Sequence, residues 1–244
     1  MSILGRFVSG AEIVFAVRRR PGCYGARAQI LYRAIMFAAK KKPAKPATPT
    51  EMKAVAIDEF GGLEVLKSRV LPVPQPSHEE VLVRVAAAGI NPVDWKTRSG
   101  AGMAEQIKAL PFVLGWDIAG TVEQQGRRVT MFEPGDRVMG MVNFPAAGGG
   151  YAEFVVAPDT HLVKVPDNLI LRDAAAVPLA ALTAWQALFD TARIGAGDRV
   201  LIHAAAGGVG HFAVQLAKQK GAYVIGTASA RNHEFARSLG CDEV

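Results

Sequence analysis

The residues best suited to chemistry form a glycine turn between an apolar strand and an amphipathic helix. The run Arg199 to Lys218 reads RVLIHAAAGGVGHFAVQLAK, and a second apolar strand follows at Ala222 to Thr227. Backbone N–H groups in such a turn can approach a pyrophosphate at the positive end of the helix, because glycine carries no β-carbon. The spacing is that of a βαβ unit and predicts a dinucleotide site; the alternative is a tight βα turn without a ligand. The residues predicted to bind the cofactor here are Ala206, Gly207, Gly208, Val209 and Gly210.

The segment after the second strand predicts which cofactor is bound. An NAD site usually has an acidic residue there for the ribose diol, whereas residues 227–232 read TASARN and contain no acid. The hydroxyl of Ser229 and the guanidinium of Arg231 suit the 2′-phosphate of NADPH. The alternative for Arg231 is an exposed charge near the start of the next helix, where a cation is mildly unfavourable.

Charge and composition exclude several classes of protein. The 244 residues include 28 Lys and Arg against 22 Asp and Glu, and two cysteines. Residues 1–51 hold ten of the basic residues and two acids, a net charge of +8, so the remainder has a net charge of −2. A slightly acidic body predicts no nucleic-acid partner. No window reaches the roughly 18 apolar residues of a transmembrane helix, so no membrane association is expected.

The basic residues 1–51 form an extension that ends in a Pro, Ala and Lys linker, Lys41 to Thr50. An acid-poor, Arg-rich N-terminus is compatible with an organelle-targeting peptide. The alternative is an extension without function. The folded body is expected to begin at Met52, and in this alternative the protein would be cytoplasmic.

Two domains are expected after the extension. Short β-rich runs separated by Pro and Gly indicate a barrel-like β domain over residues 52–177. From Leu171 the apolar spacing becomes helical, and residues 178–244 form the second domain, with a helix around Asn232 to Leu239 and a third strand beginning at Asp242. The predicted β runs of the first domain are Lys53 to Asp58, Leu63 to Val70, Val81 to Ala87, Asp117 to Val122, Arg137 to Val142, Tyr151 to Ala157 and Leu162 to Val165.

Six motifs along the chain are informative when taken together. They are GINPVDWKTRSG (89–100), LPFVLGWDIAGTV (110–122), PGDRVMGM (134–141), GGGYAEFVVAP (148–158), LTAWQAL (182–188) and HAAAGGVG (203–210). With these motifs the chain resembles the zinc-independent medium-chain dehydrogenase/reductase superfamily, in particular its quinone oxidoreductase-like, NADPH-dependent branch. The resemblance implies an α/β with β fold class: a GroES-like β-barrel domain followed by a Rossmann doubly wound domain, with the active site between them. It also implies NADPH-dependent reduction of quinones or of activated alkenes.

The same resemblance excludes zinc chemistry. Zinc-dependent relatives carry a Cys and a Gly-His-Glu motif where this chain has Asn91 and the run Gly115-Trp116-Asp117. Asn and Trp cannot replace thiolate and imidazole as zinc ligands. Trp116 is expected either to form an aromatic wall for a flat substrate or simply to pack in the core.

The resemblance also implies roles for four residues near the substrate. Asn91 would lie at the substrate and donate a hydrogen bond to the oxygen that becomes negative. Asp94 and Lys96 are expected to be an orienting pair or a proton relay, or alternatively a structural ion pair. Thr183 would lie on the helix that approaches the nicotinamide. Trp185 lies on the same helix, although helical spacing alone places it in the core.

Only 38 residues run from Gly207 to the end of the chain, too few for a complete Rossmann domain, so this domain is expected to be incomplete. Two hypotheses follow. The first is an NADPH-dependent oxidoreductase represented by part of its chain, with a small-molecule quinone or enone as partner and a homodimer in the family. The second is a truncated, non-catalytic remnant or nucleotide-binding protein.

Overall fold

The computed structural model describes residues 47–244, and residues 1–46 lie outside the described part of the chain. Residues 48–244 form one compact unit. Within the described residues, no helix is long and apolar enough to cross a lipid bilayer. The targeting role of the extension and the domain bounds at residues 52, 177 and 178 stay predictions.

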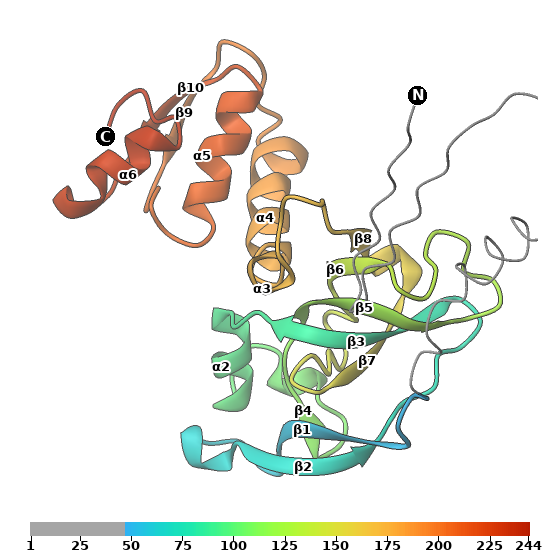
Figure 1. Ribbon diagram of the computed structural model, residues 1–244. Helices are drawn as coiled ribbons and strands as arrows, with labels where there is room; N and C mark the ends of the chain where they lie inside the picture. Colours follow the sequence, from blue (N-terminus) through green and yellow to red (C-terminus); the bar gives the residue numbers. More distant parts are fainter. Residues whose placement is uncertain (1–46) are drawn as a thin grey trace, which may run out of the picture. The chain divides into compact units, whose positions relative to one another are not determined.

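A five-stranded antiparallel sheet forms the larger part of the β structure (Figure 1). Strands β3 and β5 are buried on both faces. In β3, Val81 and Val83 enter one core cluster and Leu82 enters another, and in β5 the neighbours Ile118 and Ala119 likewise enter different clusters. This arrangement confirms the predicted strands at 81–87, 117–122 and 137–142. The strand order is β7 (Phe154–Pro158), β3 (Glu80–Ala88), β5 (Asp117–Gln125), β6 (Arg137–Met141) and β8 (Val163–Lys164).

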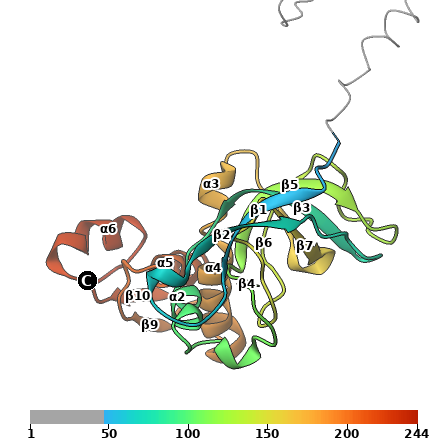
Figure 2. The same cartoon turned by 90° about the horizontal axis from the view of Figure 1, so that it is seen from below.

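A second, three-stranded sheet has the order β2 (Lys67–Pro72), β1 (Glu51–Ile57), β4 (Phe112–Val113), and Figure 2 shows β1 beside β2. The predicted run Leu63 to Val70 is wrong in its first half, where Leu63–Val65 forms a 3₁₀ turn. The Glu64 carboxylate accepts the Gly62 N–H at 2.7 Å, and this local hydrogen bond competes with strand pairing.

A short helix, α2 (Pro92–Arg98), follows β3. Pro92 occupies the first helical turn, where its missing N–H costs nothing. The Asp94 carboxylate reaches back to accept the Asn91 backbone N–H at 2.6 Å. An Asn with an acid three residues later is a helix-start signal, so the sequence contained the information for this helix, although no helix was predicted there.

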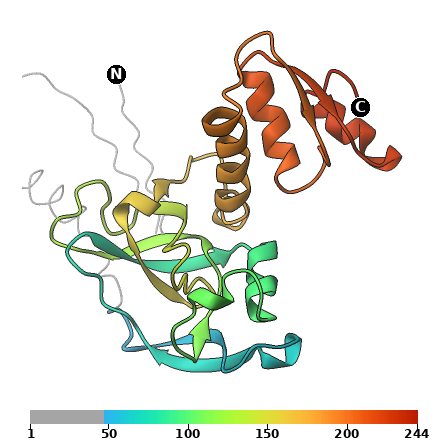
Figure 3. The ribbon, with the colours of Figure 1, turned by 180° about the vertical axis from the view of Figure 1, so that it is seen from behind.

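The C-terminal part alternates helices with a parallel strand pair. Strands β9 and β10 run parallel, with Arg199 opposite Tyr223, and α5 connects them. Figure 3 shows α5 lying beside α4. The predicted third strand at 242–244 is only a parallel bridge between Ile225 and Glu243. The elements are α3 (Leu171–Ala174), α4 (Pro178–Trp185), a π-helical turn (Gln186–Thr191), β9 (Arg199–Ile202), α5 (Gly210–Gln219), β10 (Tyr223–Gly226) and α6 (His233–Ser238).

Two glycines at the start of α5, Gly208 and Gly210, provide a test of this packing. A β-carbon on Gly210 would lie 2.2 Å from the Ala204 carbonyl oxygen, whereas one on Gly208 would meet nothing within 4 Å. We therefore expect Gly210→Ala to lower the free energy of unfolding by about 1–3 kcal/mol, the usual cost of overpacking. Gly208→Ala should change it by less than about 0.5 kcal/mol. Denaturant unfolding of both variants measures this, and equal effects would contradict the close approach at Gly210.

Candidate functional site

The glycine turn is shaped by close backbone approaches. Ala204 has a φ of 51°, in the left-handed region, and its carbonyl accepts the Gly207 N–H at 2.8 Å. Gly210 packs against the same carbonyl, so a side chain there is excluded. Gly208 instead faces open space and is exposed. The turn is therefore closed on the side of β9 and open at Gly208.

The open side of the turn carries unused hydrogen-bond donors. No hydrogen bond among the described residues uses the backbone N–H of Gly208 or Val209. These groups precede the ten-residue helix α5, whose N-terminal end carries partial positive charge. Free N–H groups at a helix N-terminus, beside a glycine without a side chain, are the chemistry of an anion site. The residues present thus fit a pyrophosphate.

The segment after β10 lies at the same sheet edge as the turn, because β9 and β10 are parallel and both end there. Thr227 joins the two ends: its hydroxyl accepts the Ala204 N–H at 3.1 Å and lies 3.2 Å from His203 Nδ1. Ser229 is exposed and accepts a hydrogen bond from Asn232 Nδ2 at 3.2 Å. Arg231 is exposed and makes no ion pair with the described residues. The structure thus brings Ser229 and Arg231 to the edge that holds the glycine turn.

A second polar group gathers around Asn91, just before α2. Asn91 is half-buried, and its side-chain Nδ2 donates to Asp117 Oδ2 at 2.9 Å. Its backbone N–H donates to Asp94. Two carboxylates therefore hold one asparagine, one through its backbone and one through its side chain.

Asp117, at the start of β5, is fully buried. The Leu179 N–H, in the first turn of α4, donates to both of its carboxylate oxygens at 3.1 and 3.0 Å. Burial raises the pKa of Asp117 from 3.8 to about 6, against the opposing effect of the hydrogen bonds from Leu179 and Asn91. Asp117 was not predicted as a site residue; it was named only as the last residue of the run that stands where zinc-dependent relatives have Gly-His-Glu. The signal available was an acidic residue beginning an apolar strand.

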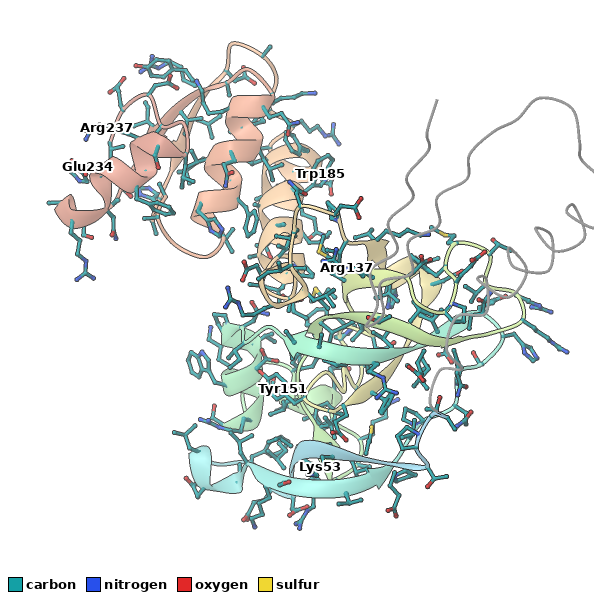
Figure 4. All side chains as sticks on the ribbon, viewed as in Figure 1. Lys53, Arg137, Tyr151, Trp185, Glu234 and Arg237 are labelled. Atoms are coloured by element: carbon teal, nitrogen blue, oxygen red, sulfur yellow. The ribbon has the colours of Figure 1, made fainter. Side chains whose placement is uncertain are left out.

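Asp94 is buried, and the half-buried Tyr151 is a neighbour of its carboxyl (Figure 4 labels Tyr151). Burial raises the pKa of Asp94, and the hydrogen bond from the Asn91 backbone and the neighbouring Tyr151 hydroxyl oppose this rise. Asp94 Oδ1 and the Tyr151 hydroxyl are both buried atoms, and neither makes a hydrogen bond with the described residues. Burial also raises the pKa of Tyr151, with the Asp94 charge as a further cause, which keeps its hydroxyl protonated.

The expected pair of Asp94 and Lys96 does not form. Asp94 is buried, whereas Lys96 is exposed and places its ammonium 5.6 Å from the centre of the Trp95 ring. Residues two apart on a helix point in different directions, so α2 separates them. Neither the orienting pair nor the alternative ion pair describes these residues.

Trp116 packs in the core rather than forming a substrate wall. It is fully buried, its Nε1 donates to the Ala146 carbonyl at 2.7 Å, and it meets Phe144 edge-on at 5.7 Å. Gly115, with a φ of 90°, leaves room for the Tyr151 ring beside it, because a β-carbon would lie 2.5 Å from that ring. The strand start therefore supplies Asp117 to the polar cluster and Trp116 to the core.

Helix α4 presents Thr183 and Trp185 to solvent (Figure 4 labels Trp185). The Thr183 hydroxyl donates to the Leu179 carbonyl one turn earlier, at 2.7 Å. Trp185 is 50% exposed and lines a cavity of about 490 Å³ with Phe189 and Leu216, so its assignment to the core was wrong. The helix is apolar nearly all round, and the pattern could not distinguish its buried face.

The predicted cofactor residues Gly207, Gly208, Val209, Gly210, Ser229 and Arg231 lie at one edge, called the turn edge, with Ala206 half-buried beside them. The predicted residues Asn91 and Asp94 form the polar cluster together with Asp117 and Tyr151, which were not predicted as site residues. The predicted residues Lys96 and Thr183 are exposed and belong to neither group. Within residues 47–244, no three His, Cys, Asp or Glu side chains are grouped so as to hold a metal ion.

Comparison with known proteins places this architecture in one class. Residues 77–167 match the family model of the alcohol dehydrogenase GroES-like domain. A chloroplastic quinone-oxidoreductase homologue of Spinacia oleracea is 43% identical over 189 residues, covering 75% of this chain and 57% of the relative.

Two solved structures extend the comparison. The quinone oxidoreductase from Coxiella burnetii is 47% identical with a TM-score of 0.74, covering 79% of this chain and 61% of that one. A mycobacterial protein solved in complex with NADPH is 38% identical with a TM-score of 0.68, covering 79% of this chain and 57% of that one. The chain thus spans about 60% of the length of these relatives. Residues 77–167 thus match the alcohol dehydrogenase GroES-like domain, and the larger part of the chain is similar to quinone oxidoreductases, members of the medium-chain dehydrogenase/reductase superfamily.

The raised pKa of Asp117 predicts a pH-dependent stability. Between about pH 4 and pH 6 the folded state holds a proton that the unfolded state has lost, so this carboxyl's contribution to stability is complete below about pH 4 and declines as pH rises through about 6. We expect the free energy of unfolding of the wild type, relative to Asp117→Asn, to fall by up to about 3 kcal/mol over this interval.

Denaturant unfolding of both proteins between pH 4 and pH 7.5 measures this difference. Subtracting the variant removes the shared titration of the other carboxyls. A difference that stays constant or grows with pH would contradict the assigned protonation of Asp117.

Proposed function

We propose that this protein is an NADPH-dependent oxidoreductase that reduces quinones or activated alkenes by hydride transfer without zinc. One observation carries the proposal. The backbone N–H groups of Gly208 and Val209, which bind nothing among the described residues, lie at the same sheet edge as the guanidinium of Arg231, which has no ion-pair partner there. A pyrophosphate needs the first feature and a 2′-phosphate needs the second. The named activities of the relatives support the same reaction class.

The chain's residues divide the binding of the cofactor between them. The turn from Ala206 to Gly210 would hold the pyrophosphate, with Gly208 giving the backbone access. Ser229 and Arg231 would hold the 2′-phosphate, and the exposed Thr183 hydroxyl would face the nicotinamide end. NADPH supplies the hydride when bound. Residues 178–244 would then be part of a Rossmann domain after a GroES-like domain at 52–177.

Asn91 would provide the hydrogen bond to the substrate. Hydride addition to a quinone or an enone leaves negative charge on an oxygen, which a fixed donor stabilises. One N–H of the Asn91 amide is bound to Asp117, so the second N–H is available to a substrate oxygen. Because Asn91 is half-buried, that donor is both reachable and held in place.

The two other proposed residues take different roles. Asp94 fixes the Asn91 backbone from a buried position and would not touch the substrate. Lys96 is exposed and without an acidic partner among the described residues, so its ammonium would supply the proton that completes the reduction. The substrate is a small molecule, and zinc has no role because Asn91 and the buried Trp116 are not zinc ligands.

The cofactor assignment is tested by Arg231→Ala. We expect this change to weaken NADPH binding by about 1.5–3 kcal/mol, the value of a hydrogen bond to a charged group, and to leave NADH binding nearly unchanged. Arg237→Ala, which removes an exposed Arg of α6, is the matched control and should affect neither. Cofactor fluorescence titration measures both affinities. Equal losses for NADPH and NADH would refute the 2′-phosphate assignment.

The reaction is tested by Asn91→Ala. Removing one oxyanion donor should lower kcat for NADPH-dependent quinone reduction by roughly 10²–10³-fold, with the NADPH dissociation constant unchanged. The control Asn168→Ala, at an exposed turn, should retain full activity. Steady-state rates with NADPH and a small quinone, then a small enone, give the result. NADPH binding by the wild type without turnover of either substrate would favour a nucleotide-binding protein instead.

A further inference from the structure

Two segments of the chain meet at Asp117, the first residue of β5. The connection from β3 to α2 approaches it twice, since the Gly89 N–H donates to the Asp117 carbonyl at 2.9 Å and Asn91 Nδ2 donates to its carboxylate. The second segment is the start of α4, through the Leu179 N–H. Asp117 Oδ2 accepts from both Asn91 and Leu179, so a single oxygen joins two elements that are far apart in the sequence.

Close packing around this residue leaves little room for rearrangement. A β-carbon on Gly89 would lie 2.9 Å from Asp117 Cβ and 2.4 Å from the Ala175 carbonyl oxygen. The β3–α2 connection therefore fits between Asp117 and the end of α3 only because residue 89 is glycine. Two independent features, the shared carboxylate oxygen and the missing side chain at Gly89, bring the same segments together.

The hydrogen bond from Asn91 to Asp117 also sets a direction. The two N–H bonds of an amide are fixed in one plane, so binding one of them determines where the other points. Leu179 lies one helical turn before Thr183, whose hydroxyl bonds back to the Leu179 carbonyl. The oxygen that orients the Asn91 amide therefore also anchors the turn of α4 that carries Thr183.

We infer that Asp117 is a positioning residue, whose buried carboxylate holds the Asn91 amide and the first turns of α4 in one arrangement for hydride transfer. The inference rests on the proposed function, because only a substrate oxygen at Asn91 and a nicotinamide near Thr183 give this arrangement a catalytic effect. Asp117 itself touches neither. Among the described residues, Asp94 of α2 and Tyr151 are the titratable groups coupled to its charge, and the first turn of α4 contributes none.

Steady-state kinetics with NADPH and a small quinone test the catalytic part. Asp117→Ala should lower kcat at least tenfold and leave the KM for NADPH unchanged, because the glycine turn is untouched. Asp117→Asn should recover much of the loss, since its amide oxygen can accept both hydrogen bonds. Asp117→Asn should also remove the change in kcat that the wild type shows near pH 6.

The matched control is Glu123→Gln, which changes a buried acid on the same strand whose partners include Arg84. An equal loss of kcat in Glu123→Gln and Asp117→Ala would overturn the positioning role.

Nuclear magnetic resonance tests the linkage without any turnover. The side-chain amide of Asn91 and the backbone N–H of Leu179 should titrate with one common midpoint in the wild type and not titrate in Asp117→Asn. Separate midpoints, or persistence of the titration in Asp117→Asn, would overturn the inference. Absence of quinone or enone turnover by the wild type, with the common midpoint present, would overturn the proposed function and leave the linkage standing.

Discussion

The buried carboxylate of Asp117 is the constraint on which the arrangement of the site depends. Removing a charged group from water is costly unless hydrogen bonds replace the lost hydration. Here the replacement comes from a side-chain amide and a backbone N–H, and these belong to two different elements. The β3–α2 connection and the start of α4 must therefore both reach the first residue of β5. The glycine at position 89 follows from the same constraint, because any side chain would keep the connection away.

The two groups of site residues differ in their electrostatics. The turn edge offers only donors and a cation, from the N–H groups before α5 and from Arg231, and it suits phosphate groups. The polar cluster contains two carboxyls beside the donor amide of Asn91. A negative charge there would oppose the formation of an oxyanion. Burial raises the pKa of both carboxyls, to about 6 for Asp117, so protonation of Asp117 below that pH lowers the opposing charge.

The positions that hold zinc ligands in zinc-dependent relatives are used differently in this chain. Asn91 is bound to Asp117 and Asp94, and Trp116 is enclosed in the core with Phe144. Neither residue could be exchanged for a ligand without disturbing its neighbours. Both residues therefore contribute to the packing and hydrogen bonding around them, Trp116 in the core and Asn91 in the polar cluster. Because the chain spans about 60% of the length of its relatives, the complete reaction remains our proposal.

The sequence alone was sufficient for features that depend on neighbours along the chain. Runs of β-favouring residues between Pro and Gly predicted β3, β5 and β6, and the strand, glycine turn and helix at 199–218 were predicted in order, since each depends on residues close in the chain. The start of α2 is also determined by residues close in the chain, Asn91, Pro92 and Asp94, although this helix was not predicted.

The contact of Asp117 with Leu179, which lies 62 residues away, could not be predicted from any local pattern in the sequence. The same holds for Tyr151 beside Asp94 and for the exposed face of Trp185. These depend on which surfaces meet when strands and helices pack, and a one-dimensional pattern of polarity does not specify the partner. Tertiary structure therefore decided how the donor amide is held, while the sequence had already indicated which residues could bind the phosphates.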